Sequence, residues 1–142
     1  MECTTNTYGN AAGSFPAKQW HDFIGFTPDQ SGTDLGWLTI NHERVSFDDN
    51  IGDGGGMTSF KIARDPNTDS IIVISQTLND GRTGEFFNID FVNTVGETGM
   101  NCGGIQSEAE GRIWTAEEWW RSNNANIYYN GEGARDTADF MI

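Results

Sequence analysis

The apolar residues of this chain come in short runs of β-strand length, each bounded by turn residues. The clearest runs are residues 20–26, 36–42, 57–64, 70–77 and 112–116. In residues 57–64, Phe60 and Ile62 share one face of an extended segment. Glycine supplies 18 of the 142 residues, far above its usual share of about 7%. Short strands and abundant turn residues predict an all-β fold.

Two turns and two long polar stretches divide these strands. Residues 65–69 (DPNTD) predict a hairpin loop, and residues 79–81 (NDG) a turn. Residues 86–95 are ambiguous between a strand and a short helical turn. Residues 45–56 and 96–110 are predicted loops, and loops of that length in a compact domain usually carry function. Residues 1–17 have little to bury and predict a flexible arm.

The charge balance excludes some partners. Eight Lys and Arg against 21 Asp and Glu give a formal charge of −13, so we expect cations rather than nucleic acid as partners. No apolar run reaches 18 residues and the first residues lack signal-peptide features, so neither a membrane span nor an export signal is predicted. Two cysteines, Cys3 and Cys102, are too few for a disulfide scaffold.

Two short motifs could carry chemistry. Asn41, His42 and Glu43 end an apolar strand, where an amide and a carboxylate can face a shared opening; a solvated strand end is the alternative. Cys102 is followed by two glycines, which leave its thiol sterically open. No His, Lys or Arg lies within five residues of Cys102 to lower its pKa, which favours a metal-bound thiolate over a lone nucleophile. A buried, inert cysteine is the alternative.

Two further segments are rich in acidic residues. Glu117 and Glu118 lie among tryptophans in residues 114–120 (WTAEEWW), and in a strand they point to opposite faces, so one is expected to face inward. A carboxylate in an aromatic pocket needs a cation or a raised pKa, and calcium is a natural partner; a charged strand end beside an aromatic patch is the alternative. Residues 48–54 miss the EF-hand spacing at Gly52 and predict a solvated turn. His21, without a second histidine at ligand spacing, is expected to have no catalytic role.

In order, NHE (41–43), GGMTSF (55–60), NCGG (101–104) and WTAEE (114–118) resemble the motifs of the PhoX-type alkaline phosphatases. Residues 22–34 also resemble the stretch that precedes NHE in that family. The resemblance is collinear from Trp20 to about Trp120, which covers about 100 of the 142 residues. The family's NCAGG lacks its alanine here, and Ala116 stands where the family often has cysteine.

The resemblance implies a β-propeller with an iron–calcium centre that hydrolyses phosphate monoesters. It implies that Cys102 is the cysteine that ligates iron, and that Glu43, Glu117 and Glu118 are metal ligands. Asn41 matches the asparagine of the family's NHE motif and is the expected catalytic contact to the substrate phosphate.

Residues 18–142 are therefore expected to form about two blades of a larger propeller, with the chain an N-terminal fragment that is inactive alone. By the same resemblance the parent protein is expected to be a periplasmic or extracellular monomer. An alternative is a non-catalytic, calcium-dependent β domain that binds a ligand such as a glycan, because five tryptophans and acidic loops also suit sugars. A purely structural β domain with a buried cysteine is the third possibility.

Overall fold

The computed structural model describes residues 2–5, 13–16, 18–44, 55–89, 91, 98–107, 111–118, 128–129 and 132–133. Throughout these residues the fold is all-β without a helix, which confirms the predicted fold class. The strands are β1 (Glu2–Thr5), β2 (Gly13–Pro16), β3 (His21–Pro28), β4 (Gly36–His42), β5 (Gly56–Arg64), β6 (Ile71–Ile74), β7 (Gln76–Thr77), β8 (Thr83–Gly84), β9 (Phe86–Asn88), β10 (Asn101–Ser107), β11 (Arg112–Glu117), β12 (Tyr128–Tyr129) and β13 (Glu132–Gly133).

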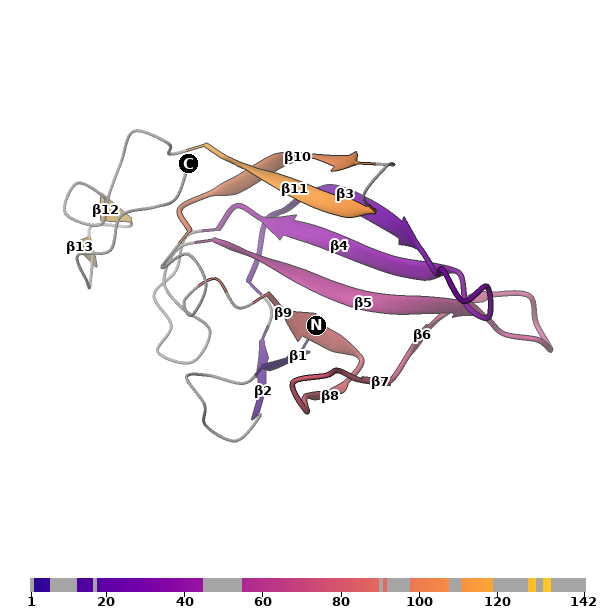
Figure 1. Ribbon diagram of the computed structural model, residues 1–142. Coiled ribbons are helices and arrows are strands. Elements are labelled where there is room, and N and C mark those ends of the chain that lie inside the picture. Colours follow the sequence, from indigo (N-terminus) through magenta and orange to yellow (C-terminus); the bar gives the residue numbers. More distant parts are fainter. Residues whose placement is uncertain are drawn as a thin grey trace.

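The main sheet has the strand order β2-β1-β9-β5-β4-β3, and β6 also pairs with β5 (Figure 1). The long strand β5 pairs with β4 along one side, while its other side is shared by β9 and β6. Strands β3, β4, β5 and β6 thus form an antiparallel meander of four consecutive strands. No closed ring of sheets is seen among the described residues.

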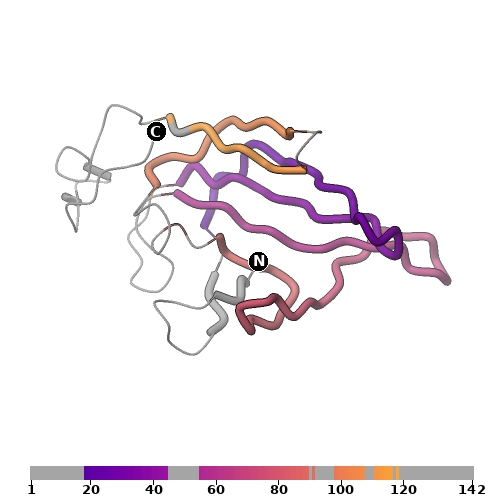
Figure 2. Tube along the Cα trace, viewed as in Figure 1, coloured from indigo at the N-terminus to yellow at the C-terminus, as the bar shows by residue number. Residues whose placement is uncertain are grey.

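A second layer, the antiparallel hairpin of β10 and β11, lies against β3 and β4 of the main sheet (Figures 1 and 2). The two layers meet closely at Gly25, because a methyl group there would overlap the side chain of Ile113. The hairpin therefore covers one face of β3 and β4, and it brings the segment around Cys102 onto that face.

Alternation along β4 separates the two faces of the main sheet. Ile40 belongs to a core cluster with Phe60 and Ile62, and partly buried Leu38, Leu35, Val73 and Phe86 pack against that cluster. Thr39 and Asn41 point to the opposite face, beneath the hairpin. One face of the sheet thus carries the apolar core cluster, and the face that meets the hairpin carries buried polar groups such as Asn41.

Several elements agree with the sequence. The run at residues 36–42 has the bounds of β4, the run at 57–64 differs from β5 by one residue, and the predicted turns at 65–69 and 79–81 are present. Asp69 and Gly81 adopt positive φ angles of 58° and 91°, which aspartate tolerates and glycine favours.

Other elements differ from the expectation. The predicted loop at 96–110 contains the seven residues of β10, whose glycines and polar side chains give little strand signal. Pairing with β11 supplies the missing stabilisation. Within the expected arm at 1–17, β1 and β2 pair with each other, and β1 joins β9. Of the ambiguous segment 86–95, residues 86–88 are strand β9. The acidic loop at 48–54 lies outside the described residues.

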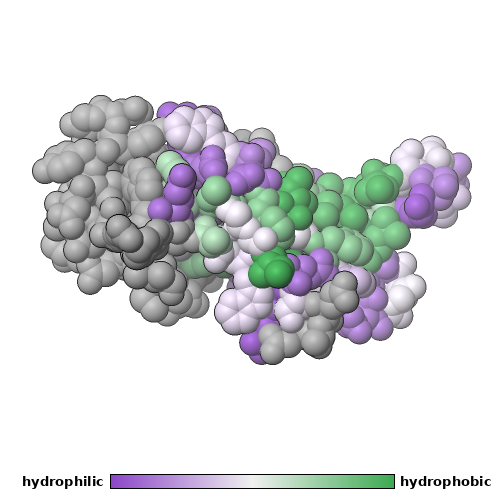
Figure 3. All heavy atoms as spheres, turned by 90° about the horizontal axis from the view of Figure 1, so that it is seen from above, coloured by the Kyte–Doolittle hydropathy of each residue, from purple (hydrophilic) through white to green (hydrophobic). Residues whose placement is uncertain are grey.

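Apolar side chains are exposed around the hairpin. Viewed from above, they gather over the middle of the molecule, between hydrophilic groups (Figure 3). Ile24 and Phe26 of β3, Ile105 of β10 and Trp114 of β11 are among the exposed large hydrophobic residues. Ile24 and Phe26 share the face of the main sheet that carries the core cluster, whereas Ile105 and Trp114 are paired with each other on the hairpin. In the part of the chain that the structure describes, no helix has the length and apolar character needed to cross a membrane.

His42 at the end of β4 makes stability depend on pH. Its side chain is fully buried, its Nε2 lies 2.7 Å from Thr58 Oγ1, and its pKa is lowered to about 4 by burial and then by the positive charges of His21 and Lys18. Since the unfolded chain holds the proton more tightly, this contribution to the free energy of unfolding is complete above pH 6.5 and is lost as the pH falls towards 4.

We expect the loss to total about 3 kcal/mol over that range. Urea denaturation of the wild type and His42→Gln between pH 4 and 7 measures it. The variant should show a flatter pH dependence, and parallel curves would contradict the assignment.

Candidate metal centre

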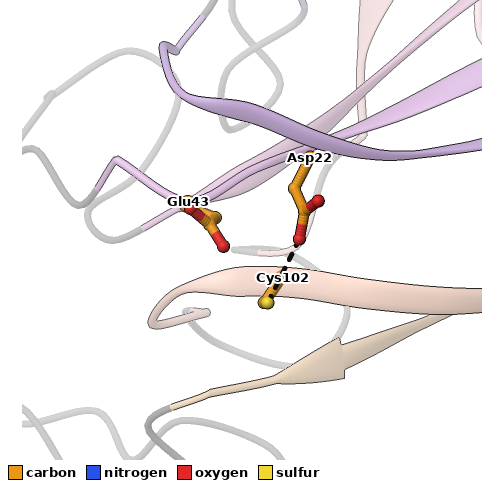
Figure 4. Close-up of side chains that lie close together, drawn as sticks. All are labelled: Asp22, Glu43 and Cys102. Carbon is orange, nitrogen blue, oxygen red and sulfur yellow. Dashed lines mark hydrogen bonds between the residues drawn. The ribbon is translucent and has the colours of Figure 1, made fainter.

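Three potential metal ligands meet beneath the hairpin. Asp22 comes from β3, Glu43 follows β4 directly, and Cys102 lies on β10. One carboxylate oxygen of each acid and the Cys102 sulfur all lie within 4.8 Å of one another. Figure 4 shows the two carboxylates and the thiol converging from these separate segments.

The local backbone explains why these side chains converge. The β3–β4 ladder has a register shift between His21 and Ile24, so Asp22 lies at an irregularity. Pairing then resumes, because the Glu43 amide donates to the Trp20 carbonyl at 2.9 Å. The β10–β11 ladder has a second shift between Asn101 and Gly104, which contains Cys102. Such bulges redirect side chains and are common beside active sites.

Asn41 fastens the irregular part of β10 to β4. Its side-chain Nδ2 donates to the carbonyl oxygens of Cys102 at 2.9 Å and Gly103 at 2.8 Å, and to Thr115 Oγ1 at 2.9 Å. Neither carbonyl belongs to a paired position of the β10–β11 ladder. The Asn41 amide therefore donates to two carbonyl oxygens that the bulge leaves without a ladder partner. The fully buried Asn41 therefore holds the main chain of Cys102 at a fixed distance from the main sheet.

The glycines of these motifs have packing roles. A methyl group at Gly104 would lie 2.5 Å from the Phe23 ring and 2.6 Å from the Trp114 carbonyl oxygen. At Gly55 it would lie 2.5 Å from the His42 carbonyl oxygen. Contacts this short exclude any larger residue without displacing backbone, so both glycines allow the close approach of β10 and β5 to their neighbours.

The electrostatics of the site favour a cation. The Cys102 thiol donates to Asp22 Oδ2 at 3.2 Å, and the carboxylates of Glu43 and Asp22 raise the pKa of the thiol to about 12. In the absence of a cation, the sulfur therefore keeps its proton near neutral pH. A bound cation reverses this balance, because it stabilises the thiolate and neutralises the two carboxylates.

The donor set fits a metal ion without selecting one metal. Carboxylate oxygens suit calcium and other hard cations, while thiolate suits softer ions such as iron or zinc. Two carboxylates and one thiolate from three different strand segments form a partial coordination shell. Further ligands would complete it.

The other predicted site residues lie along the same hairpin. Glu117 pairs with Asn101 in the ladder, and its side chain lies outside the described part of the structure. Glu118 is exposed, its amide donates to the Met100 carbonyl at 3.0 Å, and it is not in the group formed by Asp22, Glu43 and Cys102.

The hydrogen bonds of the Asn41 side chain favour a role other than contact with phosphate. Its amide nitrogen is used by three acceptors, and its Oδ1 is buried without a hydrogen-bond partner among the described residues. The remaining polar atom is thus an acceptor, which suits a cation or a hydroxyl donor better than a phosphate oxygen. The contact to phosphate stays a prediction.

Asp22 was missed by the reasoning from sequence. It lies in the 22–34 stretch that resembles the family, but nothing in its neighbourhood marks it as a ligand. Only the pairing of β3 with β4 places it near Glu43. An antiparallel pairing of these two runs, assumed from the short connection between them, is the signal that could have found it.

Comparison with known proteins gives no relative. No protein-family model, no curated protein and no solved structure matches the chain significantly. Functional inference for this chain therefore depends on its own site geometry and on the resemblance of its motifs.

Loss of the Asn41 amide is expected to destabilise the protein. Asn41→Ala leaves the carbonyl oxygens of Cys102 and Gly103 without this donor, at a cost of about 3 kcal/mol in the free energy of unfolding. Urea denaturation measures the change. The control is Asn67→Ala in the exposed 65–69 loop, which should cost little. Equal effects of the two substitutions would contradict the role of Asn41.

Proposed function

We propose that this chain supplies ligands to the iron–calcium centre of a PhoX-type phosphate monoesterase. The observation that carries the proposal is the meeting of Asp22, Glu43 and Cys102 from three separate segments. Two of these, Glu43 and Cys102, are residues that the resemblance implies as metal ligands. The third, Asp22, is an additional carboxylate at the same point.

The residues of the chain have distinct tasks in this proposal. Asp22, Glu43 and Cys102 hold a cation, and Asn41 positions Cys102 through its carbonyl group. When bound, the cations supply Lewis acidity and positive charge towards the phosphate. That charge is needed because a chain with a formal charge of −13 repels a phosphate dianion.

Glu117 and Glu118 are proposed as ligands of a second cation. The β10–β11 ladder supports this, because Glu117 is paired with Asn101, next to Cys102 in the sequence. The amide of Glu118 binds the carbonyl of Met100, on the same short segment. The backbone of both residues is therefore paired with residues 100–101, directly before Cys102.

The larger architecture is also a proposal. The four-stranded meander of β3 to β6 has the strand number and order of one propeller blade, and the β10–β11 hairpin would begin the next. The parent protein would be a monomer outside the cytoplasm, as the resemblance implies. A full-length structure in which these four strands form part of a sandwich would contradict the propeller.

Hydrolysis of p-nitrophenyl phosphate by the full-length protein tests the function. We expect activity that is lost with a calcium chelator and restored by calcium. Asp22→Asn should lower the activity, whereas Asp69→Asn in an exposed loop, where asparagine tolerates the positive φ, should leave it unchanged. Absence of hydrolysis in a protein loaded with both metals would contradict the proposal.

A further inference from the structure

A cavity lies between the main sheet and the β10–β11 hairpin. Its volume is about 460 Å³, within the range of roughly 300–1,000 Å³ typical of small-molecule sites. Thr39 of β4 and Ser59 of β5 line its floor, and Ile113, Trp114 and Thr115 of β11 line another wall. It is separate from the cluster of Asp22, Glu43 and Cys102, none of which lines it.

The lining is aromatic and uncharged. Trp37 of β4 and Phe91 are aromatic residues of the lining, Met57 adds a flexible apolar side chain, and none of the described lining residues is ionisable. A cavity of this composition favours an uncharged aromatic group and offers nothing to balance the charge of a phosphate.

The hydroxyl groups of the lining are largely occupied within the protein. Thr27 Oγ1 donates to the Gly111 carbonyl at 3.2 Å. Thr39 and Ser59 bond to each other at 3.1 Å, and Ser59 Oγ donates to the Leu38 carbonyl at 3.3 Å. A sugar ring needs several free hydrogen-bonding groups in its site, but these hydroxyl groups already donate their protons to acceptors within the protein. The lining therefore suits an aromatic ring better than a saccharide.

One hydroxyl differs from the others and links the cavity to the metal centre. Thr115 Oγ1 accepts the side-chain N–H groups of Asn41 at 2.9 Å and Asn101 at 3.2 Å, and its own proton has no acceptor among the described residues. The same Asn41 nitrogen binds the carbonyl of Cys102. One amide thus contacts both the cavity wall and the main chain that carries the proposed metal ligand.

Spacing along β4 is compatible with one ligand that spans both places. Thr39 lines the cavity about 13 Å from Glu43 along an extended strand, but the cavity also reaches Thr115, which contacts Asn41 only two residues, or about 7 Å, before Glu43. Asn41 lies between Thr39 and Glu43 on the same face. A phosphate at the metal centre could therefore have its alcohol portion directed towards the cavity, with the Thr115 hydroxyl as donor to an ester oxygen.

We propose that the cavity binds the uncharged aromatic alcohol portion of the substrate, so that aryl phosphates are the preferred class of monoester. The assignment of the ring to a substrate rests on the proposed phosphatase function. Binding of the ring itself depends only on the cavity. The two can therefore fail separately.

Binding of 2-naphthol to the metal-free full chain tests the cavity, measured by calorimetry. Trp37→Ala is expected to weaken binding at least about tenfold, because it removes the aromatic ring that β4 places on the cavity side of the sheet. Trp20→Ala is the control, since Trp20 is a tryptophan that does not line the cavity. In the NMR spectrum of the wild type, the indole N–H signal of Trp37 should shift on binding while that of Trp20 stays in place.

Three results would overturn the inference: no binding of 2-naphthol, equal weakening by the two tryptophan substitutions, or tighter binding of methyl glucoside than of 2-naphthol. Cys102→Ser should leave 2-naphthol binding unchanged, because Cys102 does not line the cavity. If 2-naphthol binds as expected but the protein holds no metal, the aromatic site stands and the phosphatase proposal fails.

Discussion

Replacing Cys102 by serine is expected to remove bound iron and abolish phosphatase activity in the full-length protein. The thiol lies within 4.8 Å of a carboxylate oxygen of Asp22 and of Glu43, and a serine hydroxyl does not ionise to a ligand comparable to a thiolate. Loss of a group that hydrogen-bonds to a metal ligand typically lowers metal affinity or activity 10–100-fold. Loss of a direct ligand should therefore lower both at least about 100-fold. Metal analysis and p-nitrophenyl phosphate hydrolysis measure the two effects.

Cys3→Ser is the control for this substitution, because Cys3 is the only other cysteine in the sequence. It should change neither metal content nor activity. Circular dichroism should show the same β content for both variants. If Cys102→Ser keeps its iron, the cysteine is not a ligand. If there is no activity to lose and ligand binding is unchanged, the protein is instead a non-catalytic binding domain.

Cys102 is also expected to react very slowly with alkylating reagents in the metal-free protein. The carboxylates of Glu43 and Asp22 raise its pKa to about 12 from an ordinary value of 9.0, and only the thiolate is nucleophilic. At pH 8 the folded protein should therefore react about 1,000-fold more slowly than the urea-unfolded chain. The rate should keep rising with pH well above 9, where a free thiol levels off.

Iodoacetamide labelling of a Cys3→Ser background, with chelator present, isolates Cys102. Glu43→Gln removes one of the two negative charges and should speed the reaction, while Glu85→Gln at an exposed position should not. A folded protein that labels as fast as the unfolded chain would show that the carboxylates do not control the thiol.

The strands that carry the fold were predictable because local pattern and tertiary structure agree there. In β4 and β5 the side chains alternate between a core face and a hairpin face. The turn residues at 65–69 mark the end of β5. Strand β10 was not predictable, because its glycines weaken any strand signal. Its conformation depends on β11 and on two hydrogen bonds from Asn41 to β10.

The candidate site was predictable in part for the same reason. Glu43 directly follows a well-defined strand, and Cys102 stands out in a chain with two cysteines. Asp22 depends on a register shift in the pairing of β3 with β4, which no local pattern encodes. The use of the Asn41 amide as a clamp likewise depends on carbonyl groups 61 and 62 residues away in the sequence.

The metal content of the full-length protein tests the proposed function most directly. Inductively coupled plasma mass spectrometry of the protein, purified without chelators or added metal, should find iron and calcium in stoichiometric amounts. The iron should disappear in Cys102→Ser and remain in Cys3→Ser. A wild-type protein that contains neither iron nor calcium, and takes up neither when they are supplied, would contradict the proposed metal centre at Asp22, Glu43 and Cys102.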